Sequence, residues 1–276
     1  MAHGPLLQSS SRRTTSRNTT LSGRVLDIGC GKGGDIQKWR NAGIKEYVGL
    51  DLAIVSVNQA RERWQNWNGN KSDRFDATFA QLDCYTHYLS ESEELGPQVL
   101  SQPFDVVTMQ FCMHYAFETE KKVRVMLDNV TKYLRPGGRF IGTIPNSDVL
   151  LSSLDEARKS NPDALSFGND VYNVRFDSYE GPLYGHRYVF FLADAVEDVP
   201  EYVVYWREFV KLAGQFGLKL VYKREFHDIY VDDAEDPEFK GLLRRMGVVD
   251  ESNESAMDHA QWDAANVYLA FAFEKI

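Results

Sequence analysis

A short apolar run placed directly before a cluster of glycines constrains the fold most strongly. The run "RVLDI" occupies residues 24–28, and "GCGKGG" follows at residues 29–34 before a helical pattern begins. Gly29, Gly31 and Gly34 have the spacing G-x-G-x-x-G between a strand and a helix, so backbone amides can approach a ligand without intervening side chains. The pattern predicts a ligand-binding turn at the end of the first strand of an α/β domain.

The rest of the chain continues this alternation of strands and helices. Hydrophobic patterning predicts strands at 46–52, 77–83, 104–111, 139–145, 218–226 and 266–275. It predicts helices at 34–41, 56–67, 119–134, 201–217 and 237–246, and "RPGG" at 135–138 as a helix stop. Parallel neighbours need crossover connections, so we expect a mostly parallel sheet with helices on both faces.

Two parts of the chain depart from the alternation. Residues 1–22 are rich in Ser, Thr and Arg without apolar periodicity, so we expect a flexible tail followed by one folded domain over 23–276. Residues 151–200 also depart from strict alternation. A helix is predicted at 149–160, and strand-like segments follow it at 171–176 and 184–192. We expect an insertion here that covers one end of the sheet.

Composition limits the setting and the partners. The 276 residues are 43% hydrophobic and carry a net charge of -9, which argues against a broad phosphate-binding surface and favours local contact with any nucleic acid. No apolar stretch approaches the roughly 20 residues of a membrane span, and no secretory leader opens the chain. We therefore expect a cytosolic or nuclear protein without a membrane partner. Cys30, Cys84 and Cys112 lack CxxC spacing, so we expect reduced thiols and no metal site.

Acidic residues near the glycines indicate the kind of ligand. Asp51 ends the second strand, 22 residues after Gly29, where a carboxylate would accept hydrogen bonds from ribose hydroxyls. An adenosine-type cofactor fits, and both NAD and S-adenosylmethionine contain adenosine. Asp27 suits a cationic amino-acid tail better than an anionic pyrophosphate. Asp83, at the end of the third strand, is placed to bind the exocyclic amine of adenine. Together these acids favour S-adenosylmethionine.

Five segments in order carry a family resemblance. They are "VLDIGCGKGGDIQKW", "QFCMHYAFE", "PGGRFIGTIPNS", "VPEYVVYW" and "ANVYLAFAFEK". Over about residues 24–275 the chain resembles the eukaryotic mRNA cap guanine-N7 methyltransferases. The resemblance implies methyl transfer from S-adenosylmethionine to N7 of the 5′ cap guanine of RNA. It also implies a Rossmann-like methyltransferase fold with a mostly parallel seven-stranded sheet and a cap-binding insertion, a nuclear location, and a capping-machinery or activating protein as partner.

The resemblance also assigns site residues. It implies that Glu201 accepts hydrogen bonds from the guanine, that Tyr115 and Tyr268 form aromatic walls, that Pro145 gives a flat apolar contact and that His114 gives a polar one. The matching donor-side positions are Asp27, Gly29, Gly31, Asp51, Asp83 and Gln110, with Lys32 and Asp35 as further candidates. Without the resemblance, His114 and Tyr115 after a buried strand would more often be packing residues, and Glu201 would more often be a carboxylate at a helix start.

The expected chemistry needs no catalytic acid or base. Guanine N7 already carries a lone pair, so the protein would act chiefly by aligning donor and acceptor. Cys30 and Cys112 flank the predicted site without a basic partner at motif spacing, so we expect packing thiols.

Three alternatives stay open at the level of sequence. The glycine motif also fits an NAD-dependent oxidoreductase. The family's helical segment before the first strand carries an asparagine, a lysine and an aromatic residue, and "SRRTTSRNTTLSG" at 11–23 offers no counterpart. A catalytically impaired cap-binding or scaffold module is therefore a second alternative. Methylation of a small molecule or a protein is the third.

Overall fold

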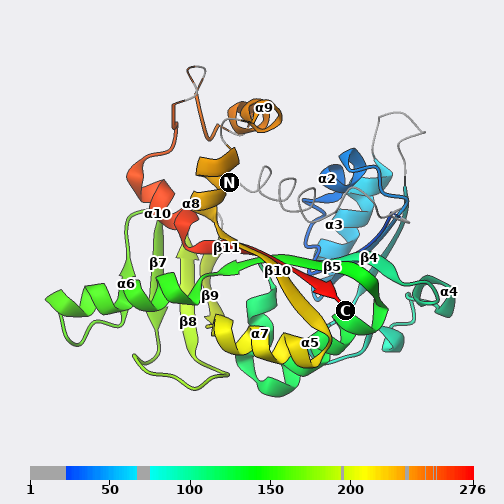
Figure 1. Cartoon of the computed structure of the whole chain (residues 1–276), viewed down its shortest axis with the longest axis horizontal. Coiled ribbons are helices and arrows are strands. Elements are labelled where there is room, and N and C mark those ends of the chain that lie inside the picture. The colour runs from blue at the N-terminus through cyan, green and yellow to red at the C-terminus, as the bar shows by residue number, and fades with distance from the viewer. Residues whose placement is uncertain are drawn as a thin grey trace.

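A seven-stranded sheet forms the centre of the structure, in the order β10-β11-β5-β4-β1-β2-β3 (Figure 1). The computed structural model describes residues 23–66, 75–193, 196–233, 236–245, 247–250, 252 and 254–276, so the predicted tail at 1–22 lies outside the described residues. The strands are β1 (Arg24–Ile28), β2 (Glu46–Asp51), β3 (Asp76–Gln81), β4 (Phe104–Gln110), β5 (Leu134–Pro145), β10 (Leu218–Glu225) and β11 (Tyr268–Lys275). Within this order, β11 runs antiparallel to the other six strands, which are parallel to one another. The predicted mostly parallel sheet is confirmed.

Helices cover both faces of this sheet. Helices α2 (Ile36–Asn41) and α3 (Ile54–Gln65) lie on one face, and α5 (Glu120–Tyr133) and α7 (Trp206–Gln215) lie on the other (Figure 1). Short helices α4 (Pro97–Leu100), η2 (Leu89–Glu91) and η3 (Met113–Glu118) lie in the connections. The helix predicted at 119–134 packs one apolar side against the sheet, because Val123, Met126, Leu127 and Val130 are fully buried.

A second, antiparallel sheet lies beside the end of β5 (Figure 1). It has the order β6-β7-β8-β9, with β6 (Ser166–Gly168), β7 (Tyr172–Phe176), β8 (Arg187–Leu192) and β9 (Val196–Tyr202). Helix α6 (Ser147–Ser160) precedes it, and Leu150 and Leu154 of that helix share a buried cluster with Val174, Phe176 and Tyr188. The expected departure from βα alternation after residue 150 therefore takes the form of a small sheet, whose buried cluster also includes residues of α8, α10 and β11.

Two predicted boundaries are wrong. The helix predicted at 201–217 begins only at Trp206, because Glu201 and Tyr202 belong to β9 and pair with β8. The apolar run "YVVYW" fits either period, and strand pairing decides it. Helix α5 ends at Tyr133, as the helix stop at "RPGG" predicts, but the strand predicted from Arg139 begins at Leu134 and includes that segment. A register shift absorbs the extra residues before Arg139 pairs with Val106.

Between β10 and β11, the described residues form the helices α8 (Phe226–Asp233), α9 (Pro237–Arg245) and α10 (His259–Asn266). The sequence predicted α9 but neither α8 nor α10. A local signal for α10 was present: Asp258 and Gln261 form a capping box, in which each side chain binds the other residue's backbone N–H.

Aromatic packing under α7 makes a testable contribution to stability. Phe271 of β11 is fully buried, with its ring centroid 5.3 Å from that of Phe140 and 5.7 Å from that of Trp206. We expect Phe271→Ala to lower the free energy of unfolding by roughly 3–5 kcal/mol, because it leaves a cavity in this cluster. Chemical denaturation measures the change. Val221→Ala on β10 is the control: its side chain is 42% exposed, and the expected change is below about 0.5 kcal/mol.

Candidate functional site

The turn after β1 is held against the end of β2 by its own backbone. Gly29 and Cys30 donate their N–H groups to the Leu50 carbonyl at 2.8 and 2.9 Å, and Gly31 donates to Asp51 Oδ2 at 2.8 Å. Gly29 and Gly31 have φ angles of +76° and +52°, a conformation that glycine adopts without steric cost. A Cβ atom on Gly31 would meet nothing within 4 Å. The turn therefore leaves open space beside bare backbone.

The close approach of the turn to helix α3 falls on Gly33 and not on Gly34. Gly33 has a φ of +73°, and a Cβ atom there would lie 3.1 Å from Ala60 of α3 and 2.5 Å from Ile36 Cδ1. A Cβ atom on Gly34 would meet nothing within 4 Å. Packing against α3 therefore requires a glycine at position 33, which the G-x-G-x-x-G spacing does not include.

Asp27 is a buried carboxylate directly below the turn. Its Oδ2 accepts a hydrogen bond from the Tyr47 hydroxyl at 2.7 Å. Burial, followed by the nearby charge of Asp35, raises the pKa of Asp27 from 3.8 to about 7, although the Tyr47 hydrogen bond and Lys38 act in the opposite direction. Asp35 itself forms an ion pair with Lys38, and Lys32 is exposed. A cationic group bound beside Asp27 would favour its ionised form.

The other predicted donor-side residues lie along the same edge of the sheet. Asp51 ends β2, and its Oδ1 accepts from the Ala53 N–H at 2.9 Å. Asp83 follows β3 and accepts from the Tyr85 N–H at 3.0 Å and, through Oδ2, from the Thr86 hydroxyl. Gln110 ends β4. Since β3, β2, β1 and β4 are adjacent and parallel, their carboxyl ends bring Asp27, Asp51, Asp83 and Gln110 to one edge.

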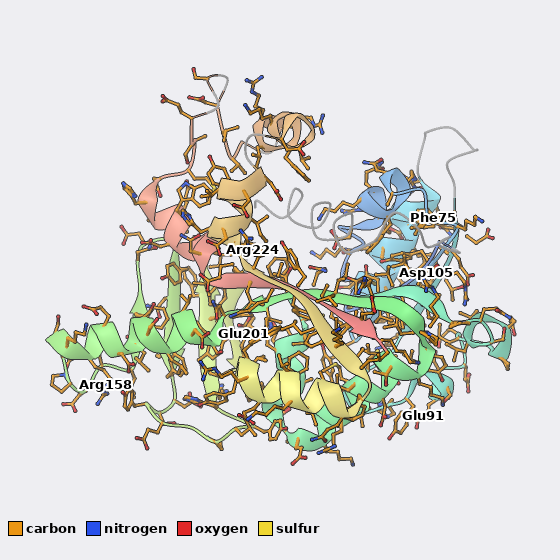
Figure 2. The ribbon with its side chains drawn as sticks, in the orientation of Figure 1. Phe75, Glu91, Asp105, Arg158, Glu201 and Arg224 are labelled. Atoms are coloured by element: carbon orange, nitrogen blue, oxygen red, sulfur yellow. The ribbon has the colours of Figure 1, made fainter. Side chains whose placement is uncertain are left out.

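A second buried carboxylate, Glu201, comes from β9 of the second sheet (Figure 2). Glu201 of β9 is 4% exposed, and its Oε1 lies 3.2 Å from His114 Nε2 and 3.3 Å from the Tyr115 hydroxyl. Its Oε2 accepts from the Tyr188 hydroxyl at 2.8 Å. Burial alone would raise the pKa of Glu201, but His114 and the hydrogen bonds outweigh it and lower that pKa. Glu201 is therefore held as an ionised acceptor.

His114 is buried with unused hydrogen-bonding capacity. It is 1% exposed; its Nε2 lies 3.2 Å from Glu201 Oε1, whereas its Nδ1 has no hydrogen-bond partner among the described residues. Burying a polar group without a partner costs free energy, and such orphaned groups are uncommon in folded proteins. The Nδ1 atom is therefore available to a polar group that binds in this site.

Pro145 and Tyr268 form an apolar wall at the end of the main sheet. They are cross-strand partners, Pro145 ending β5 and Tyr268 beginning β11. The Tyr268 ring packs edge-on against Phe111 at 5.0 Å and lies 5.8 Å from Phe226. Because β11 is antiparallel to β5, its first residue lies at the same edge as the carboxyl ends of the parallel strands. The predicted acceptor-side residues thus come from η3, β5, β9 and β11 and meet near one edge.

Sequence reasoning missed two residues of this site. Tyr188 reaches Glu201 because they are register partners on β8 and β9, and this register was not predictable from the segment "YGHRYVFFL". Phe111 follows Gln110 with a φ of +57°, which is rare for a bulky residue and is found mainly at functional sites. No sequence pattern marks that conformation.

The cysteines are buried packing residues. All three are free and buried, and burial raises their thiol pKa values well above the ordinary range. Cys112 Sγ donates to the Ile28 carbonyl at 3.2 Å. A Cβ atom on Gly29 would lie only 2.6 Å from this sulfur atom. Among the described residues, no cluster of His, Cys, Asp or Glu could hold a metal ion. In the same part of the chain, no helix is both long and apolar enough to cross a membrane.

Comparison with known proteins identifies the family of the chain. The mRNA (guanine-N(7))-methyltransferase domain matches residues 5–276. The chain belongs to this family. The mRNA cap guanine-N(7) methyltransferase of Cryptococcus neoformans (strain JEC21) is 51% identical over 257 residues, which cover 92% of this chain and 40% of that protein. The protein of the same name from Schizosaccharomyces pombe is 46% identical, over 91% of this chain and 68% of its own length.

Solved structures support the methyltransferase fold. The CcbJ methyltransferase from Streptomyces caelestis matches with a TM-score of 0.56 and 13% identity, covering 100% of this chain and 90% of that chain. The glycopeptide N-methyltransferase MtfA, solved with S-adenosylmethionine, matches with a TM-score of 0.53 and 13% identity, covering 100% and 95%. The predicted Rossmann-like, S-adenosylmethionine-dependent methyltransferase fold is confirmed, and so is the predicted family.

The two neighbouring glycines provide a matched test of the turn. We expect Gly33→Ala to lower the free energy of unfolding by about 1–2 kcal/mol, because the residue is left-handed and its Cβ would press on Ala60. Gly34→Ala should change it by less than about 0.5 kcal/mol. Urea denaturation of both variants measures the difference. Equal effects would show that the packing constraint is not at Gly33.

Asp27 should make the stability of the ligand-free protein depend on pH. Its folded pKa of about 7 lies above the ordinary 3.8, so between these values the folded state holds a proton that the unfolded state releases. The contribution of Asp27 to stability is therefore greatest below pH 3.8 and is lost as the pH rises through about 7. Asp27→Asn should remove this decline, so the variant gains on the wild type in thermal melts at higher pH. Asp163→Asn, at an exposed position, should follow the wild type.

Proposed function

We propose that this chain transfers a methyl group from S-adenosylmethionine to N7 of the 5′ cap guanine of RNA. The observation that carries the proposal is the meeting of two sets of residues at one sheet edge. One set is the bare turn with Asp27, Asp51 and Asp83, and the other is the buried Glu201 with its tyrosines and His114. Family membership adds the substrate class, because both relatives described above are named for cap guanine-N7 methylation.

The donor side fits S-adenosylmethionine by charge and by space. Open space at Gly31 leaves room beside backbone, and Asp51 retains lone pairs for ribose hydroxyls. Asp27 would face the cationic amino-acid tail, and Asp83 the adenine amine. When bound, S-adenosylmethionine supplies an electrophilic methyl group on a sulfonium. The nearby acids would bind this cation, whereas they would repel the pyrophosphate of NAD. This disfavours the oxidoreductase alternative.

The acceptor side fits a guanine base. Ionised Glu201 can accept hydrogen bonds from the N–H groups of its Watson–Crick edge, and a charged acceptor gives stronger bonds than a neutral one. Tyr115, Tyr268 and Pro145 would contact the faces and edge of the purine, and His114 would use its free nitrogen on the nucleotide. Positive charge develops on the purine during transfer, and the carboxylate of Glu201 would stabilise it.

Alignment is then the main contribution of the chain to the reaction. The N7 lone pair needs no deprotonation, so no described residue has to act as a general base. Fixing two reactants in line can lower the activation free energy by about 7–11 kcal/mol in favourable cases. Strand ends and a packed turn provide the rigidity that this alignment requires.

The wider setting belongs to the same proposal. The chain spans 40% of the length of the Cryptococcus neoformans relative, so the activity of the whole protein, its capped RNA substrate and a capping-machinery or activating partner are inferred from the family. A nuclear location follows from the mRNA-processing step for which the relatives are named. The family match starts at residue 5 and so extends into the stretch where we found no counterpart of the family's helical segment. This weakens the case for a non-catalytic module.

The reading of guanine by Glu201 is testable with a neutral isostere. We expect Glu201→Gln to raise the KM for a capped dinucleotide roughly 10- to 100-fold, because hydrogen bonds to a charged group are lost. The KM for S-adenosylmethionine should not change. Initial rates of methyl transfer, with the product position identified by mass spectrometry, give both constants.

Glu208→Gln on α7 is the matched control for this experiment. The Glu208 side chain is 47% exposed and pairs with Lys211 on the surface. It should keep wild-type constants. A normal cap KM in Glu201→Gln would remove the role given to Glu201, whereas methylation at another atom, or none by the wild type, would contradict the proposed reaction itself.

A further inference from the structure

One buried polar residue of α5 has three hydrogen bonds outside its own helix. Asn129 is 1% exposed and lies among the apolar residues that α5 packs against the sheet. Its side-chain amide donates to the carbonyls of Cys84 at 3.0 Å and His87 at 2.8 Å, and its Oδ1 accepts from the Leu89 N–H at 3.0 Å. Every polar atom of the Asn129 side chain is thus used on one loop.

That loop is the one that begins at Asp83. The Asp83 carbonyl accepts from the N–H groups of Thr86 at 3.2 Å and His87 at 2.9 Å, so the chain turns sharply there. The same turn brings the Tyr85 N–H and the Thr86 hydroxyl to the Asp83 carboxylate. The orientation of the Asp83 side chain therefore depends on the shape of the turn, and Asn129 holds that turn at both of its ends.

We propose that Asn129 is a positioning residue for the methyl donor, which fixes the 83–89 loop so that the Asp83 carboxylate faces the adenine amine. The proposal rests on the proposed function, because it assigns the donor to this edge. Irregular loops lack the repeating hydrogen bonds of helices and strands, so buried backbone groups need side-chain partners. Asn can serve carbonyl and N–H groups at once, whereas Leu or Ala cannot.

The effect should be selective for the donor. The acceptor-side residues are held by other contacts: Tyr115 by Glu201, and η3 by the bond from Gly185 N–H to the Phe117 carbonyl at 2.8 Å. The loop keeps a second anchor without Asn129, since the Tyr85 hydroxyl donates to the Cys112 carbonyl at 2.7 Å. A change at Asn129 is therefore expected to loosen Asp83 without dismantling the acceptor side.

Two variants and one control test the inference. Asn129→Asp keeps the acceptor for Leu89 but has no donor for the two carbonyls, and Asn129→Ser leaves room for water beside the loop. Thr131→Val is the control, because the Thr131 hydroxyl is buried on the same helix and donates to the Leu127 carbonyl of that helix at 2.8 Å. Thermal melts without ligand establish that each protein is folded.

We expect the KM for S-adenosylmethionine and the Kd of S-adenosylhomocysteine, measured by calorimetry, to rise about tenfold in both Asn129 variants. The KM for the capped dinucleotide and both constants of Thr131→Val should stay at wild-type values. Equal rises in the two KM values, unchanged donor binding, or failure of both variants to fold where Thr131→Val folds would each overturn the positioning role. If the wild type bound no S-adenosylhomocysteine, the proposed function would fail instead.

Discussion

The hydrogen bonds from the turn after β1 to the end of β2 are the interaction on which the rest of the site depends. Gly29, Cys30 and Gly31 turn their N–H groups toward Leu50 and Asp51, so the turn cannot move without breaking buried bonds. With the turn fixed, Gly33 can pack on α3 and the Cys112 side chain can lie under Gly29. The positions of the donor-side edge and of the start of η3 therefore both depend on the backbone conformation of this turn.

Two buried carboxylates of the site have opposite ionisation tendencies for identifiable reasons. Asp27 has one strong hydrogen bond and a neighbouring acid, so burial dominates and its pKa rises to about 7. Glu201 is as deeply placed, but it faces His114 and two tyrosine hydroxyls, and its pKa falls. Under the proposed function this division is useful. Asp27 would become fully ionised when a cationic tail arrives, whereas Glu201 is ready to accept hydrogen bonds before the base binds.

The parts of the fold that follow from local patterns were predictable, and the parts that follow from pairing were not. The periodicity of apolar residues in α5 shows which face of that helix is buried. The alternation of strands and helices around the glycines predicts the parallel sheet. The donor-side acids could be placed for the same reason, since each stands at a strand end. Glu201 was expected at a helix start and lies in β9, because "EYVVYW" fits both periods and only pairing with β8 decides between them. Tyr188 and the left-handed Phe111 were missed because register and backbone strain arise from tertiary packing.

The position of Glu201 is fixed from two sides, and this matters for a reaction that depends on alignment. In the second sheet, β9 pairs with β8, and the Val203 N–H that follows it donates to the His186 carbonyl. Toward the main sheet, the chain runs directly into α7, whose Trp206 is buried against Phe271. A carboxylate on a free-standing insertion could shift with the whole insertion. Because the strand that carries Glu201 leads within a few residues into a helix packed on the main core, the base-reading group and the donor edge share one rigid framework, as a site with angstrom-scale tolerance requires.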